Sequence, residues 1–155
     1  MTVDDVRRAE WSHEAGEPSL NSVLDVRLFL ERAKRLTEAT LHLRVSHGER
    51  RDQIEGPSWD YEAGVQLPGW SASRIEPEEW WTRRPDDWIA RRLAQYEHLV
   101  GGNCVGWVVT GQEVGRGPDH EPLLVHMTYW ARIGLDVFGE ASDVYQSRFD
   151  VGGIH

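Results

Sequence analysis

Hydrophobic residues recur at helical spacing in three stretches of the chain. In residues 25–38 apolar side chains repeat every three or four positions, which predicts a helix with one buried stripe that Asn21 or Ser22 can cap. In residues 85–99 a proline opens a second helix, and two aspartates lie in the first turn, where the helix dipole favours negative charge. Residues 136–149 show the same spacing and predict a third helix at the end of the chain.

Other stretches have the patterns of strands. Residues 40–46 alternate between apolar and polar side chains, which predicts a half-buried strand. Residues 104–110 and 123–130 are richer in apolar and β-branched residues and predict more central strands. A shorter strand is expected within residues 64–73, interrupted by a Pro-Gly pair.

The remaining stretches are polar. Residues 49–64 and 111–122 are charged, contain glycine and proline, and are predicted to be loops. Residues 1–20 are expected to form an N-terminal tail or a short helix, and residues 21–155 one globular domain. Helices and strands are interspersed without a strict strand–helix–strand rhythm, so we expect an α+β domain with a small, mostly antiparallel sheet and three main helices.

The composition fits one domain and excludes some classes of binding partner. A chain of 155 residues is long enough for an independent core, and eight tryptophans compensate for the modest 39% of hydrophobic residues. The net charge of −9 argues against nonspecific nucleic-acid binding and against binding to anionic membranes. Cys104 is the only cysteine, and there is no long apolar run or signal-peptide core, so a cytoplasmic protein is expected. The oligomeric state is not indicated.

The polar face of the strand at residues 40–46 is the first candidate site. His42, Arg44 and Ser46 share that face, and His47 follows at the end of the strand. An arginine beside a core needs an anionic partner, because an unpaired charge in a low-dielectric environment is costly. The partner is either a ligand phosphate or carboxylate, or an aspartate or glutamate of the protein itself.

The polar stretch at residues 111–122 is the second candidate. It combines glycines, which allow close approach of the backbone to a ligand, with Arg116 and the acids Glu113, Asp119 and Glu121. Loops of this length are often functional, although a solvated connection with two turns is the alternative.

Two serines form the third candidate. Ser71 and Ser73 are separated by one residue, so on a strand their hydroxyls face the same side and can brace a loop or orient an acid. Ordinary turn and edge-strand serines are the alternative. The histidines lack metal-ligand spacing and the single cysteine excludes the usual zinc sets, so no metal is expected.

Two groups of motifs resemble known families. Residues 43–48 with 56–62, and residues 115–119 with 121–124, resemble a family of small uncharacterised actinobacterial proteins, a domain of unknown function, over residues 20–149. That resemblance implies no activity.

A weaker likeness is to ADP-ribosyltransferases of the arginine–serine–glutamate type. The resemblance implies that Arg44 holds the phosphate of NAD, that Ser71 is the bracing hydroxyl and that Glu121 is the catalytic carboxylate. The sequence departs from that family at Ala72, where a threonine is expected, at Asp119, two residues before Glu121, where a glutamine, glutamate or similar residue is expected, and at Pro122, which follows the glutamate.

We therefore carry two functional hypotheses. The first is an enzyme acting on a nucleotide or NAD-like anion, similar to an ADP-ribosyltransferase, with Glu121 or Glu113 as catalytic residue and NAD as cofactor. Its ligand-binding residues would be Arg44, His47, Tyr61, Ser71, Ser73, Arg116 and Asp119. The alternative is a noncatalytic module that binds a protein partner or a small ligand through its acidic, tryptophan-rich surface.

Overall fold

The β7–β8 hairpin is the centre of the fold. The computed structural model describes residues 18–149. β7 (Val105–Arg116) and β8 (Pro122–Ile133) pair antiparallel over most of their length, and the register shifts at three places along the hairpin. Such bulges bend and twist the strands, which allows this long ribbon to curl around a core.

Short strands complete the main sheet on both sides of the hairpin. β2 (His42–Ser46) lies beside β7, and β6 (Ser73–Arg74) lies beside β2. On the other side β8 pairs with β1 (Ser19–Leu20) and with β5 (Trp70–Ser71). Residues 70–74 therefore contact both β8 and β2, so the sheet is curled.

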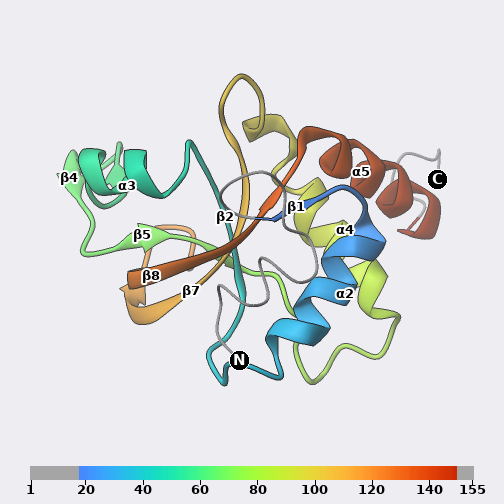
Figure 1. Ribbon diagram of the computed structural model, residues 1–155. Coiled ribbons are helices and arrows are strands. Elements are labelled where there is room, and N and C mark those ends of the chain that lie inside the picture. Colours follow the sequence, from blue (N-terminus) through green and yellow to red (C-terminus); the bar gives the residue numbers. More distant parts are fainter. Residues whose placement is uncertain (1–17, 150–155) are drawn as a thin grey trace.

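Three helices cover one side of this sheet: α2 (Val23–Ala33), α4 (Pro85–Ala94) and α5 (Leu135–Phe149) (Figure 1). A short 3₁₀ helix, η1 (Glu97–Leu99), follows α4. The helices bury their apolar faces against each other and against β2, β7 and β8, in a core that includes Phe29, Leu93, Val108 and Phe138. Ser22 caps α2 by accepting a hydrogen bond from the backbone N–H of Asp25, so the predicted cap is confirmed.

A second, smaller core lies within the curl of the sheet. Its buried side chains come from the face of the sheet that is turned away from the helices, and they are Ala72, Val105, Trp107, Val109, Leu124 and Tyr129. Alternation along β2 sends Leu43 to the helix side and Arg44 to this second side.

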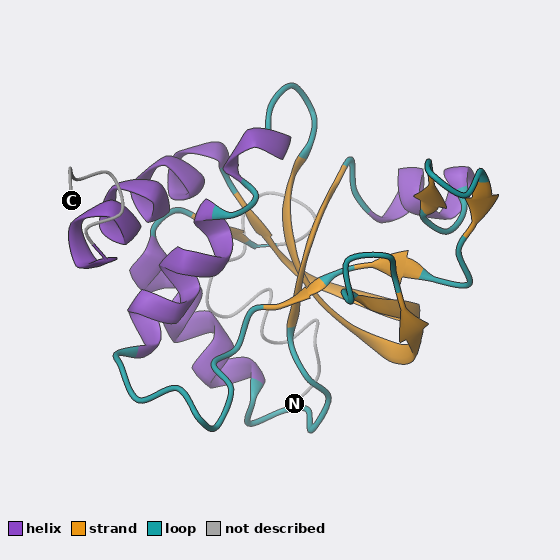
Figure 2. Cartoon of the chain, turned by 180° about the vertical axis from the view of Figure 1, so that it is seen from behind, coloured by secondary structure: helices purple, strands orange, loops and turns teal. Residues whose placement is uncertain are grey.

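A lobe projects from the sheet on the side opposite the helices (Figure 2). It consists of α3 (Glu49–Glu55) and the small hairpin of β3 (Trp59–Asp60) and β4 (Val65–Gln66), and we call residues 49–66 the α3 lobe. The prediction of a loop over residues 49–64 was therefore wrong. Only Asp52 of α3 is buried, so the helix lacks the apolar stripe by which a sequence pattern would reveal it.

The fold class was predicted correctly and its details were not. The described residues form a single α+β domain, but the sheet is mixed, because β1 runs parallel to β8, and there are four α-helices in this part of the chain rather than three. The predicted loop at residues 111–122 is mostly strand, and only residues 117–121 connect β7 to β8. The end of β7 is solvent-exposed, so its polar residues gave it the appearance of a loop.

The structure describes the two ends of the chain only in part. The tail or helix predicted for residues 1–20 falls mainly on residues 1–17, which lie outside the described residues; Ser19 and Leu20 form β1. Among residues 18–149, every helix is too short or too polar to span a bilayer.

Candidate functional site

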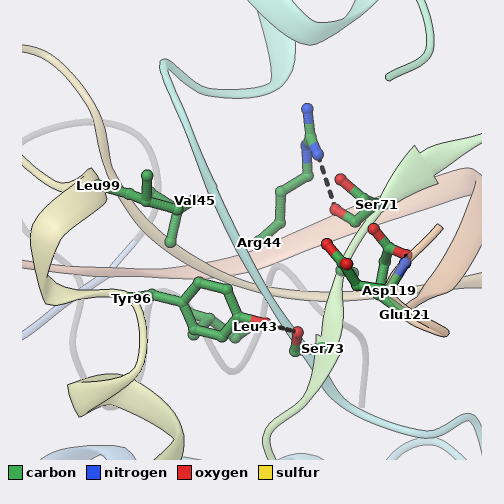
Figure 3. Close-up of a pocket in the computed structure, with 10 residues that line it drawn as sticks. Leu43, Arg44, Val45, Ser71, Ser73, Tyr96, Leu99, Asp119 and Glu121 are labelled. Carbon is green, nitrogen blue, oxygen red and sulfur yellow. Dashed lines mark hydrogen bonds between the residues drawn. The ribbon is translucent and has the colours of Figure 1, made fainter. Parts of the chain in front are cut away.

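A cleft lies where residues 71–74, β2, the end of α4 and the 117–121 turn meet. It has two adjoining hollows of about 250 and 300 Å³. We call the first the apolar hollow, because Leu43, Val45 and Leu99 form much of its wall (Figure 3). The second is the polar hollow. The two hollows share four of their lining residues, which are Ser73, Tyr96, Asp119 and Glu121.

The turn between β7 and β8 fixes the carboxylate of Glu121. The N–H of Gly117 donates to the backbone carbonyl of Glu121 at 2.8 Å, and the N–H of Asp119 donates to Oε1 of Glu121 at 3.1 Å. The carboxylate packs directly over Gly117, where a Cβ atom would lie 2.1 Å from Oε1. His120 takes a positive φ of 63° within this turn. Glycine at position 117 is therefore required for the observed position of the Glu121 carboxylate.

The polar hollow contains both signs of charge. Its wall includes three arginines and four acids: Arg74, Arg92, Arg116, Glu78, Glu113, Asp119 and Glu121. Nε of Arg116 lies 3.2 Å from Glu113, and Nε of Arg92 donates to the carbonyl of Arg74 at 2.7 Å. The arginine side chains are thus held in place, and the hollow as a whole is close to electroneutral.

Ser73 and Tyr96 join the two hollows. The hydroxyl of Ser73 hydrogen-bonds to the phenolic hydroxyl of Tyr96, and both side chains line each hollow (Figure 3). This contact connects the sheet to the segment after α4. A ligand in the cleft would meet an aromatic ring and two hydroxyl oxygens at this point.

Arg44 borders the apolar hollow, but its guanidinium is already paired. Nε and Nη2 donate to the two carboxylate oxygens of Asp52, each at 2.9 Å, and Nη1 donates to the carbonyl of Ser71 at 2.8 Å (Figure 3). Each guanidinium nitrogen therefore has a protein partner. Of the two alternatives left open by the sequence, the structure has the protein carboxylate rather than a ligand.

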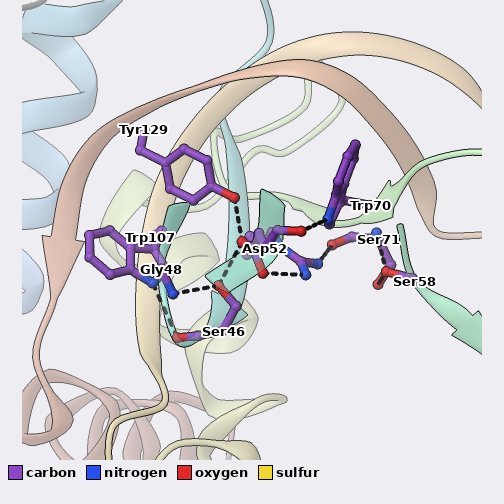
Figure 4. Close-up of polar contacts among 9 residues, drawn as sticks. Ser46, Gly48, Asp52, Ser58, Trp70, Ser71, Trp107 and Tyr129 are labelled. Carbon is purple, nitrogen blue, oxygen red and sulfur yellow. Dashed lines mark hydrogen bonds and ion pairs between the residues drawn. The ribbon is translucent and has the colours of Figure 1, made fainter. Parts of the chain in front are cut away.

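Asp52 is the centre of a buried network. Its Oδ2 also accepts hydrogen bonds from the hydroxyls of Ser46 and Tyr129 (Figure 4). Burial alone would raise the pKa of the Asp52 carboxyl, but hydrogen bonds and charge from Arg44, with the bonds from Tyr129 and Ser46, hold that pKa below its ordinary value. Burial and the neighbouring carboxylate raise the pKa of the Tyr129 hydroxyl, so it remains a donor.

The cleft brings together most of the residues predicted from sequence. Ser71, Ser73, Asp119 and Glu121 line the apolar hollow beside Arg44, while Glu113 and Arg116 line the polar hollow. His47 and Tyr61 line neither hollow: His47 is exposed at the end of β2, and Tyr61 is 89% exposed on the α3 lobe.

Sequence reasoning missed several cleft residues. Tyr96 and Arg92 come from α4 and its end, which the pattern marked only as a core helix, and no sequence signal places them beside the β7–β8 turn. Arg74 could have been found, because it directly follows Ser73 on the same edge strand. Among residues 18–149 there is no group of three or more His, Cys, Asp or Glu side chains arranged to hold a metal ion.

Comparison with known proteins gives a family without an activity. No curated protein and no solved structure matches the chain. A family model described as "Family of unknown function (DUF6098)" matches residues 15–152. This range is nearly the whole chain and includes both hollows of the cleft. The protein belongs to the DUF6098 family of unknown function.

Proposed function

We propose that the protein is an enzyme that binds a nucleotide or NAD-like ligand in the cleft and cleaves a bond at the ribose. The observation that carries this proposal is the position of Glu121. Its carboxylate is fixed by the turn and is shared by a mainly apolar hollow and a hollow with three arginines. A small-molecule site commonly combines an apolar wall with a few fixed polar groups.

The charge distribution favours a ligand that carries both signs. A purely anionic ligand would gain little from a hollow in which acids balance the arginines. NAD carries a cationic nicotinamide ring and two phosphates. The arginines Arg74, Arg92 and Arg116 would bind the phosphates, while Asp119 and Glu121 would lie near the cationic nicotinamide riboside.

The proposed chemistry uses Glu121 as an electrostatic catalyst. Cleavage of the bond between ribose and a nitrogenous base passes through a state with positive charge on the sugar. A fixed carboxylate stabilises that charge, and such preorganised electrostatic stabilisation is often the largest catalytic contribution. Glu113 is the weaker candidate, because it is exposed at the end of β7 and pairs with Arg116.

The proposal assigns Arg44 a different task from that of an NAD anchor. Its guanidinium binds Asp52 and the main chain of Ser71, and so it holds the Ser71 edge of the cleft in place. Phosphate binding then depends on the arginines of the polar hollow. The resemblance to ADP-ribosyltransferases survives in the proposal only as the type of reaction.

Calorimetry and an NAD-consumption assay test the proposal. We expect NAD to bind the wild type and to be consumed, and Glu121→Gln to lower the rate by roughly 10²-fold or more while NAD still binds. Glu113→Gln should retain most of the rate, and Glu55→Gln, an exposed change on the α3 lobe, serves as the control. The absence of both binding heat and turnover with NAD in the wild type would contradict the proposal.

A second candidate function rests on the α3 lobe. Its 18 residues include four of the large exposed hydrophobic side chains: Ile54, Trp59, Tyr61 and Val65 are 69, 50, 89 and 50% exposed. Several large apolar side chains exposed on one small lobe are typical of an interaction surface. The noncatalytic alternative is therefore a protein-binding module that uses this lobe.

The partner that this surface fits is a second copy of the chain. In a twofold contact the exposed apolar side chains of the lobe would be covered by the same side chains of the second copy. Sedimentation equilibrium should show dimers of the wild type and monomers of a Trp59→Ser, Tyr61→Ser double variant. A wild type that remains monomeric at all concentrations would contradict self-association.

A further inference from the structure

The ring of His42 lines the polar hollow, although only 5% of the residue is exposed. Its Nδ1 lies 3.0 Å from the carbonyl oxygen of Thr40. A carbonyl oxygen can only accept, so Nδ1 carries the proton in this hydrogen bond. In the neutral ring, Nε2 is then the nitrogen with the free lone pair.

Nε2 has no hydrogen-bond partner among residues 18–149. The contact with Thr40 is the only hydrogen bond that the His42 side chain makes in that part of the chain. Nε2 keeps some contact with solvent, since it is not among the fully buried polar atoms that lack a partner there. A histidine with a purely structural role normally uses both ring nitrogens within the core. Here one nitrogen fixes the tautomer and the other is accessible from the cleft.

The surroundings of His42 keep its ring neutral. Burial lowers the pKa of the imidazole and outweighs the opposing effects of the Thr40 carbonyl, Glu113 and Glu76, while Arg74 adds a smaller lowering effect. The other charged or titratable groups of the polar hollow are Glu78, Arg92, Tyr96, Arg116, Asp119, His120 and Glu121. A neutral imidazole with a fixed tautomer is suited to accept a proton.

We propose that His42 is the proton acceptor of the cleft and that the enzyme transfers the ribosyl group to water. This inference rests on the proposed function and specifies its acceptor. Nε2 of His42 takes a proton from a water molecule, and the water oxygen forms a bond to C1′ of the nicotinamide ribose. The C1′–nitrogen bond breaks, and its electron pair neutralises the departing nicotinamide ring.

The step needs no further reactant. NAD and water give ADP-ribose, nicotinamide and one proton, which His42 passes to solvent. Glu121 stabilises the positive charge on the ribose while the bond breaks, so the two residues have separate roles. His42 accepts a proton from the nucleophile, whereas Glu121 acts on the charge of the sugar.

The variant His42→Asn separates the catalytic role from the structural one. The amide nitrogen of asparagine can replace Nδ1 as donor to Thr40, but no acceptor remains at the position of Nε2. We expect ADP-ribose formation at saturating NAD to fall by roughly 10²-fold, with unchanged NAD affinity. The fall in wild-type rate at acidic pH, where His42 becomes protonated, should be absent in the variant. His98→Asn, an exposed change on η1, is the control.

Different failures have different meanings. An active wild type whose rate and pH profile are unchanged by His42→Asn would overturn the role of His42 and leave the proposed function intact. ADP-ribose attached to a hydroxyl or a protein, in place of free ADP-ribose, would overturn water as the acceptor. A wild type that neither binds nor consumes NAD would refute the proposed function and this inference with it.

Nitrogen-15 NMR of the histidine ring gives a readout that does not depend on activity. We expect the Nδ1–H tautomer at neutral pH and a change in the Nε2 signal when NAD is added. The Nε2–H tautomer would overturn the inference even if the enzyme is active.

Discussion

Arg44 and Asp52 form a two-point ion pair, in which Nε and Nη2 each lie 2.9 Å from a different carboxylate oxygen. The side chains are 12 and 4% exposed. Arg44 lies on β2 and Asp52 on α3, so this pair, with Ser46 and Tyr129, joins the α3 lobe to the sheet. The arginine that the sequence pattern suggested as a ligand anchor is therefore part of the internal framework.

Removing the Asp52 carboxylate should destabilise the whole domain. Asp52→Ala leaves the buried Arg44 without its counter-ion, and breaking a buried pair from one side costs about 3–5 kcal/mol. Urea unfolding measures this change. The matched control is Arg51→Met, which removes the exposed Arg51–Glu55 pair of the same helix and should cost less than about 1 kcal/mol. Equal effects of the two changes would contradict the structural role of Asp52.

The same carboxylate makes stability depend on acid pH. The folded-state pKa of Asp52 lies below its ordinary value of 3.8, so the unfolded chain takes up the proton more readily. The contribution is complete well above that value and is lost as the pH falls through the folded pKa. The difference in unfolding free energy between the wild type and Asp52→Asn should therefore be constant near neutral pH and shrink below about pH 4. A difference that stays constant down to pH 2.5 would contradict this assignment.

Gly117→Ala should impair the cleft without unfolding the protein. The added Cβ would lie 2.1 Å from Oε1 of Glu121, so the carboxylate must move. Displacement of a catalytic group by about 1 Å can cost on the order of 10²-fold in rate. Gly115→Ala is the control, because nothing lies within 4 Å of a Cβ at that position. NAD consumption and thermal unfolding of both variants provide the comparison.

Gly106→Ala should destabilise the core behind the cleft. A Cβ at this position on β7 would lie 2.7 Å from the ring of Phe138 and 3.2 Å from Ile133. Overpacking of a close-packed interior costs roughly 1–3 kcal/mol. The double variant Gly106→Ala, Phe138→Leu, measured by the same urea unfolding, should recover part of this loss. No loss from the single change would show that α5 moves freely away from the sheet.

The sequence predicted what a periodic pattern can reveal. α2 with its Ser22 cap, α4 and α5 each have an apolar stripe, and β2 alternates, so their side chains report which face is buried. α3 has no such stripe, since it is held by one buried carboxylate. The outer half of β7 has the polar pattern of a loop, because both of its faces meet solvent there.

The site was predictable in part for a similar reason. Ser71, Ser73, Asp119 and Glu121 were chosen from local motifs, and the fold places all of them in one cleft. The partner of Arg44 could not be identified, because Asp52 follows eight positions later in a stretch that was predicted to be a loop. Pairing between distant segments, such as Tyr96 with Ser73, leaves no local pattern in the chain.

The position of β1 has a consequence for how the chain folds during synthesis. Ser19 and Leu20 pair with Arg132 and Ile133, so β1 can take its place only after β8 has been synthesised. β2 likewise obtains its neighbour only when β7 has been made. The sheet therefore cannot be completed until the segment that contains β8 has been made, because its pairing joins segments that are far apart in the sequence.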